Sequence, residues 1–179
     1  MKPEHERFMR IDAAFHAGDL AALRAAVEDQ ENFPNGLMPA GIGTCLEYAV
    51  YHSPLAFIQT LLEMGADPNP ADHIGFPPLI AALSGSRPQA GSPGRPDVVD
   101  IMTLLLRFGA DPNQRGVNDY TPLHMAVAER NLPALRLLLK SGADPECRTR
   151  IDEYETPREM ALNAGLLEIA EVLAARQRL

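Results

Sequence analysis

A short block, Gly-Ala-Asp-Pro followed by Asn or Glu, occurs three times in this chain of 179 residues, at 65–69, 109–113 and 142–146. Each copy follows an apolar run with helical spacing, "FIQTLLEM", "IMTLLLRF" or "LRLLLKS". A second block recurs as "TCLEYAV", "PPLIAAL", "TPLHMAV" and "TPREMAL", beginning at 44, 77, 121 and 156. Successive copies of each block begin 33 to 35 residues from one another, except for one interval of 44 in each block. Two motifs that recur in one phase predict a stack of similar units.

These blocks resemble the ankyrin repeat. "DHIGFPPLIAA" at 72–82 fits the opening of the family motif, "TPLHMAV" is the cleanest copy, and "GADPN" fits its close. The resemblance implies an all-α ankyrin repeat solenoid, in which helix-turn-helix units are stacked and joined by β-hairpin-like loops. It implies one domain over 1–179 with a divergent first and last repeat. The five repeats are expected at about 8–36, 37–69, 70–113, 114–146 and 147–179.

The residue types in these blocks suit helix ends. Thr121 before Pro122 predicts a helix start, because Thr caps free N–H groups and Pro lacks the N–H that would go unpaired there. Asp97 predicts the N-cap of a later helix, with Asp100 three residues on as a variant capping box. The glycines of the closing block predict helix ends in left-handed geometry, at Gly65, Gly109 and Gly142.

The spacing of 44 places 11 extra residues in the third repeat, within "SGSRPQAGSPGRP" at 84–96. The period resumes beyond this insertion, so it interrupts a helix–helix turn and does not link two domains. Its Pro residues lack the N–H donors of a phosphate-binding loop. Gly, Ser and Pro predict a mobile flap beside the groove, which can be deleted without loss of the fold. Arg87 and Arg95 would then be available to an acidic partner.

Charge and composition narrow the classes of partner. The net charge is −8, and residues 1–80 carry 11 acidic and 4 basic side chains. An acidic chain gains nothing from nucleic acid phosphates or anionic membranes, and no apolar run is long enough to cross a bilayer. Two cysteines give no disulfide framework, the N-terminus lacks an apolar signal segment, and Arg outnumbers Lys 14 to 2. We expect a cytoplasmic, bacterial, monomeric protein.

No catalytic or cofactor-binding pattern accompanies the repeats. The histidines form no H-x-x-x-H pair, and no Ser stands in a G-x-S-x-G block. His124 lies in "TPLH", where the resemblance implies hydrogen bonds within and between repeats. His16 and His52 follow the first helices of neighbouring repeats, which leaves a metal-binding pair as an alternative, although no Cys or second carboxylate completes a site. We expect no enzyme activity, no cofactor and no metal.

Two carboxylates, Asp12 and Glu47, occupy the place of the motif histidine in the first two repeats. Neighbouring carboxylates can raise each other's pKa, as in an acid–base pair. Hydrogen-bonded helix contacts are the favoured interpretation of both.

The resemblance implies that the chain binds another protein through a concave groove and its hairpin tips. The acidic first half favours a partner with a basic patch, although an acidic cap also aids solubility. The expected function is a non-enzymatic protein–protein interaction module. The alternative is a small stand-alone inhibitor or immunity protein that blocks a toxin or an enzyme. Candidate contact residues are His16, Tyr51, His52, His73, Ile74, Phe76, Val117, Asn118, Tyr120, Glu129, Tyr154 and Asn163.

Overall fold

The computed structural model describes residues 3–27, 29–36, 38, 43–70, 75–87, 94–116, 119–150 and 154–176. Four candidate contact residues, His73, Ile74, Val117 and Asn118, lie outside these ranges. The described residues form ten helices and no strand. The helices are α1 (Pro3–Ala17), α2 (Leu20–Ala26), α3 (Cys45–His52), α4 (Leu55–Glu63), α5 (Pro78–Ser84), α6 (Val98–Arg107), α7 (Pro122–Ala128), α8 (Leu132–Lys140), α9 (Pro157–Asn163) and α10 (Leu167–Arg176).

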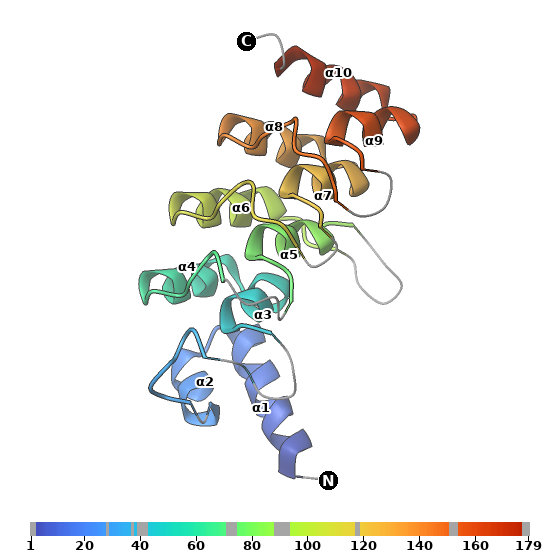
Figure 1. Cartoon of the computed structure of the whole chain (residues 1–179). Coiled ribbons are helices and arrows are strands. Elements are labelled where there is room, and N and C mark those ends of the chain that lie inside the picture. The colour runs from blue at the N-terminus through green and yellow to red at the C-terminus, as the bar shows by residue number, and fades with distance from the viewer. Residues whose placement is uncertain are drawn as a thin grey trace.

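Consecutive helices form pairs, and the pairs stack into an elongated solenoid (Figure 1). The odd-numbered helices make one layer, in which α3, α5, α7 and α9 each contact the next. The even-numbered helices α4, α6, α8 and α10 make the second layer in the same way. The expected all-α solenoid of helix pairs is therefore confirmed. No helix within the described ranges is long and apolar enough to cross a lipid bilayer.

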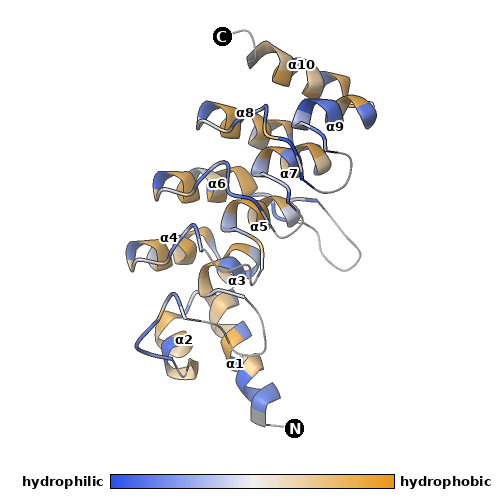
Figure 2. Ribbon diagram, in the orientation of Figure 1, coloured by the Kyte–Doolittle hydropathy of each residue, from blue (hydrophilic) through white to orange (hydrophobic). Residues whose placement is uncertain are grey.

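One apolar core runs through the stack from Ile11 to Leu173. Figure 2 shows hydrophobic residues on the faces where the helices pack, with polar residues toward the loops. Each odd-numbered helix contributes a buried alanine at the same motif position, two residues after the place of the motif histidine. These alanines let neighbouring helices approach closely, because any larger side chain would meet the next helix. They are Ala14, Ala49, Ala82, Ala126 and Ala161.

Most of the expected helix ends are present. Thr121 and His124 form a capping box on α7, and the Thr44 hydroxyl accepts the N–H of Glu47 at 3.1 Å on α3. The glycines that follow α4, α6 and α8 have φ near +90°, and a Cβ placed on them would meet no atom within 4 Å. Backbone conformation, not space, therefore requires glycine there. Asp97 stands at the N-cap of α6, as predicted, but its side chain makes no cap hydrogen bond and binds Arg95 instead.

An asparagine ladder joins the turns that follow the even-numbered helices. The Asn69 amide donates to the Gly109 carbonyl at 2.8 Å and accepts the Asp111 N–H at 2.6 Å. Asn35 and Asn113 make the same two bonds to the repeat that follows each. Each asparagine thereby satisfies backbone groups that the helix end leaves unpaired. The Asp-Pro-Asn turn thus links repeats as well as reversing the chain.

The described ends of the insertion pack against the stack. The Arg95 N–H donates to the Gly85 carbonyl and the Arg95 guanidinium to the Val50 carbonyl, both at 2.9 Å, and Asp97 neutralises its charge at 2.8 Å. Arg87 reaches Glu129 at the end of α7 at 2.6 Å. Arg95 is therefore mostly covered by its own chain, whereas Arg87 binds Glu129 but keeps half of its side chain exposed. Residues 88–93 lie outside the described ranges.

Candidate functional site

Three of the loops that precede odd-numbered helices contain a residue with positive φ. Gly75, Asp119 and Tyr154 stand two residues before a helix N-cap, and their φ values are 137°, 62° and 54°. Backbone bonds close these loops in a hairpin-like way, as between the Thr149 N–H and the Glu155 carbonyl at 3.0 Å. Tyr154 is 62% exposed at such a loop. A large side chain on left-handed backbone is uncommon, and here it points into solvent.

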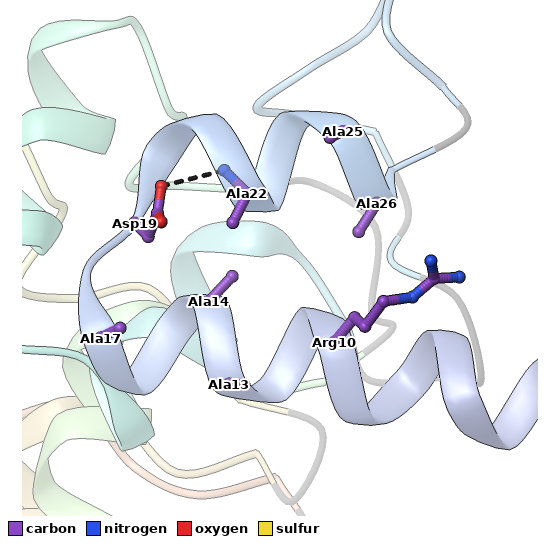
Figure 3. Close-up of a pocket in the computed structure, with 8 residues that line it drawn as sticks. All are labelled: Arg10, Ala13, Ala14, Ala17, Asp19, Ala22, Ala25 and Ala26. Atoms are coloured by element: carbon purple, nitrogen blue, oxygen red, sulfur yellow. Dashed lines mark hydrogen bonds between the residues drawn. The ribbon is translucent and has the colours of Figure 1, made fainter.

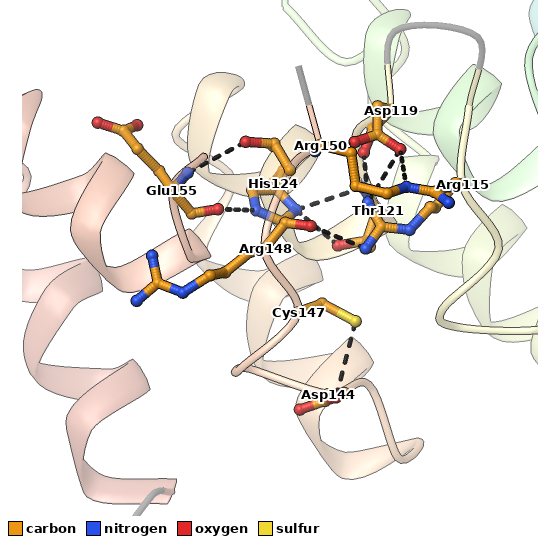
Figure 4. A network of polar contacts seen from close by, with 10 residues as sticks. Arg115, Asp119, Thr121, His124, Asp144, Cys147, Arg148, Arg150 and Glu155 are labelled. Carbon is orange, nitrogen blue, oxygen red and sulfur yellow. Dashed lines mark hydrogen bonds and ion pairs between the residues drawn. The ribbon is translucent and has the colours of Figure 1, made fainter. Parts of the chain in front are cut away.

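A polar network fastens the loops of the fourth and fifth repeats (Figure 4). Asp119 accepts the Arg150 N–H and binds the guanidinium groups of Arg115 and Arg150, each at 3.1 Å. Burial raises the pKa of Asp119, but its bonds with Arg150 and the charge of Arg115 outweigh burial and hold this pKa below its ordinary value. These bonds help to stabilise the left-handed backbone of Asp119, a conformation that a short polar side chain can adopt by hydrogen-bonding locally.

His124 is fully buried within this network. One ring nitrogen, Nε2, lies 3.0 Å from the Glu155 carbonyl and therefore carries the proton, since a carbonyl oxygen only accepts. The other, Nδ1, accepts the Thr121 hydroxyl at 2.8 Å. Burial lowers the pKa of His124. The hydrogen bonds expected within and between repeats are confirmed, and both ring nitrogens are engaged in them.

Glu47 occupies the position of His124 in the second repeat, but it accepts a hydrogen bond where His124 donates one. Its Oε1 accepts the Phe76 N–H at 2.8 Å, where His124 donates to a carbonyl. Burial raises the pKa of Glu47, and the N–H groups of Phe76 and Thr44 only partly offset this. Asp12 accepts the Tyr48 hydroxyl at 2.6 Å. Both carboxylates are thus hydrogen-bonded to the next repeat, as expected, Asp12 to a side chain of helix α3 and Glu47 to the loop before α5.

Aromatic rings gather at the C-terminal ends of α1 and α3. The His52 ring lies 4.4 Å from the Tyr48 ring and 5.3 Å from the His16 ring, measured between centroids. Burial lowers the pKa of His52, and the neighbouring His16 lowers it further. Burial and the hydrogen bond to Asp12 raise the pKa of Tyr48. The structure therefore brings His16 and His52 together, which the sequence left as an alternative.

The remaining candidate residues divide by exposure. Tyr51, Phe76 and Tyr120 are half-buried and pack against the core. The Tyr51 hydroxyl lies 2.9 Å from Ser84 Oγ, and Glu129, with 12% of its side chain exposed, binds Arg87. The candidates with exposed side chains in the described ranges are His16, His52, Tyr154 and Asn163. The sequence could not predict which candidates are exposed, because the repeat places a residue on an element but does not show how its neighbours cover it.

A pocket that the sequence analysis missed lies between α1 and α2 at the N-terminal end of the stack (Figure 3). Its volume is about 470 Å³, and alanines line it, with Arg10 and Asp19 as its polar residues. Asp19 caps α2 through the Ala22 N–H at 2.9 Å. The alanines that recur in both helices are the sequence feature that could have predicted this pocket, because small side chains leave space between the helices. In the part of the chain that the structure describes, no three His, Cys, Asp or Glu side chains are arranged to hold a metal ion.

Comparison with known proteins connects this architecture to a family. Family models of ankyrin repeats match residues 46–90 and 92–178. Cyclin-dependent kinase 4 inhibitor B of Rattus norvegicus is 29% identical over 144 residues, which are 78% of this chain and 97% of that protein. Ankyrin repeat protein nuc-2 of Neurospora crassa is 35% identical over 63% of this chain, and alpha-latrocrustotoxin-Lt1a of Latrodectus tredecimguttatus is 31% identical over 66%. The chain spans only 9% and 7% of those two proteins.

Proposed function

Because this chain belongs to the ankyrin repeat family, whose repeats generally serve as binding modules without catalytic activity, we propose that it binds a partner protein and is not an enzyme. The proposed contact surface consists of the loops before the odd-numbered helices and the exposed C-terminal ends of α1, α3 and α9. It includes the exposed candidates His16, His52, Tyr154 and Asn163.

One observation carries this proposal, namely the conformation of Tyr154. Its backbone has a φ of 54°, and 62% of the residue is exposed. Bonds to Arg148 and Thr149 fix the loop around it. A strained residue that does not fill the core is often retained for contact with a ligand. Tyr is also enriched at interface hot spots, because it offers a large apolar area and a polar tip.

The charge distribution supports a partner with a basic patch. Asp29 and Glu31 follow α2, and Glu63 is the last residue of α4. All three lie within residues 1–80, where acidic side chains outnumber basic ones. A field of one sign speeds the encounter with a partner of opposite sign. We also propose that the protein is a monomer in the bacterial cytoplasm, based on two unpaired cysteines and the excess of Arg over Lys.

A stand-alone inhibitor is the second candidate, either of an enzyme or, as an immunity protein, of a toxin. A specific observation favours this class: the similarity to the rat kinase inhibitor extends over 97% of that protein. Such a protein acts by occupying its target, so it uses the same surface as a binding module. The two functions differ only in whether the partner loses activity on binding.

Affinity capture with matched variants tests the proposal. The wild-type chain should retain a partner from its native lysate, Tyr154→Ala should retain much less, and Arg136→Ala on the exposed face of α8 should behave as the wild type. Assay of the captured partner with and without the chain then separates inhibitor from binding module. Equal retention by wild type and Tyr154→Ala would rule out the assigned surface.

A further inference from the structure

The two histidines at the ends of α1 and α3 lie at a distance that suits a shared metal ion. Their ring centroids are 5.3 Å apart, and the rings are tilted by 40°. A Zn–N bond of about 2.1 Å places a ring centre about 3.2 Å from the ion. Two imidazoles on one tetrahedral ion therefore have centroids about 5 Å apart. Both side chains are exposed, so their rings can turn toward an ion without disturbing the core.

The hydrogen bonds of His16 engage Nδ1 and leave Nε2 as the nitrogen for a metal ion. His16 Nδ1 lies 2.9 Å from the Asp12 carbonyl oxygen. A carbonyl accepts only, so Nδ1 carries the proton and Nε2 keeps its lone pair in the neutral ring. Asp12 Oδ1 also lies 3.3 Å from Nδ1. A metal-binding histidine usually donates its other N–H to a carbonyl or carboxylate in this way, which fixes its tautomer and raises its basicity.

The neighbouring groups hold this arrangement in place. The Tyr48 hydroxyl donates to Asp12 Oδ1 at 2.6 Å, and the Tyr48 ring packs on His52 at 4.4 Å. Arg95 is the nearby cation, and its charge is neutralised by two bonds to Asp97, at 2.8 and 3.0 Å. The Asp12 carboxylate, 3.3 Å from His16 Nδ1, acts on His52 more strongly than the charge of Arg95 does, which favours a bound cation.

We propose that His16 and His52 bind one divalent transition metal ion of the zinc type between α1 and α3. Imidazole nitrogen selects such ions over Mg²⁺ and Ca²⁺, which take oxygen ligands. Two histidines fill half of a tetrahedral shell. Water completes it in the isolated chain, and a side chain of a protein bound at this surface can replace that water.

Zinc titration of the full untagged chain by calorimetry tests this site. The wild type should bind one Zn²⁺ and no Mg²⁺. Either His16→Ala or His52→Ala should weaken zinc binding by about tenfold or more. His5→Ala, on an exposed histidine of the same helix α1, is the matched control and should bind as the wild type. Long-range ¹H–¹⁵N spectra should show a zinc-dependent shift at His16 Nε2 while Nδ1 keeps its proton.

Three results would overturn the proposal. They are no zinc binding by the wild type, undiminished binding by both His16→Ala and His52→Ala, and binding that is instead lost in Cys147→Ser, since Cys147 is the half-buried thiol. Circular dichroism of each variant shows whether the helices persist. None of these results bears on partner capture through Tyr154, so the metal site and the proposed function fail separately.

Discussion

At the scale of single residues, Tyr154 offers a test in which stability and binding should change in opposite directions. Left-handed backbone costs a residue with a side chain about 1 kcal/mol relative to glycine, and Gly75 stands at the equivalent place in the third repeat. Tyr154→Gly should therefore raise the free energy of unfolding by about 1 kcal/mol. The same change removes the exposed ring and should weaken partner capture. Urea denaturation and the capture assay measure the two effects.

Arg130 provides the matched control. Its φ is 51°, and it stands six residues after the motif histidine, where the first and fifth repeats have Gly18 and Gly165. Arg130→Gly should stabilise the protein to a similar extent and leave partner capture unchanged. A loss of stability in Tyr154→Gly, with a gain in Arg130→Gly, would mean that the tyrosine ring packs on its own chain.

The raised pKa of Glu47 predicts a dependence of stability on pH. Stability from a group whose folded-state pKa is raised is fully present below its ordinary value of 4.5 and is lost as pH rises through the raised pKa. Glu47→Gln keeps an oxygen for the Phe76 N–H without the buried charge. The variant should be more stable than the wild type at pH 7, and the difference should shrink toward pH 4. Denaturation across this range checks the trend, and a gap that is constant with pH would contradict it.

At the scale of elements, the insertion is tied to the stack through Arg95. The side chain of Arg95 is 16% exposed, against 50% for Arg87. Arg95→Ala should cost about 2 kcal/mol, because the Val50 carbonyl loses a charged donor and Asp97 loses its counter-ion. Arg87→Ala breaks an exposed ion pair and should cost less than about 1 kcal/mol. Urea denaturation of the two variants measures both losses in the free energy of unfolding. Equal small losses would mean that the insertion is not tied to the stack, as the sequence predicts for a mobile flap.

The elements show what a periodic sequence can and cannot predict. Thr121, Pro122 and the glycines act within one turn, so local rules predict their roles correctly. Asn69 acts across 40 residues, on the carbonyl of Gly109, and no local rule reveals that bond. The pairs Pro34-Asn35, Pro68-Asn69 and Pro112-Asn113 carry the signal, once the period is known. Asp97 stands at its predicted N-cap position, but its carboxylate binds Arg95, two residues earlier and inside the insertion, so it makes no cap hydrogen bond.

At the scale of the whole molecule, the period predicts the stack but not which residues stay exposed. Tyr51 and Tyr120 lie on the expected elements, yet neighbouring helices half-bury both. The proximity of His16 and His52 likewise depends on how α1 and α3 cross, which spacing along the chain does not give. The candidate site is therefore a product of packing between repeats, whereas the fold is a product of the pattern within each repeat.

Stability along the solenoid should also follow position in the stack. The helices α5 and α7 each contact an odd-numbered helix on both sides, whereas the end pairs α1–α2 and α9–α10 have a neighbouring pair on one side only. The ends also expose apolar groups, the alanine-lined pocket at one and Leu162 and Leu167 at the other. In a linear stack each interface adds to local stability, so the ends should open more often than the centre. Hydrogen exchange measured by mass spectrometry should be about tenfold slower or more in peptides from α5 to α8 than in those from α2 and α10. Uniform protection along the chain would instead show that the five helix pairs unfold as one cooperative unit.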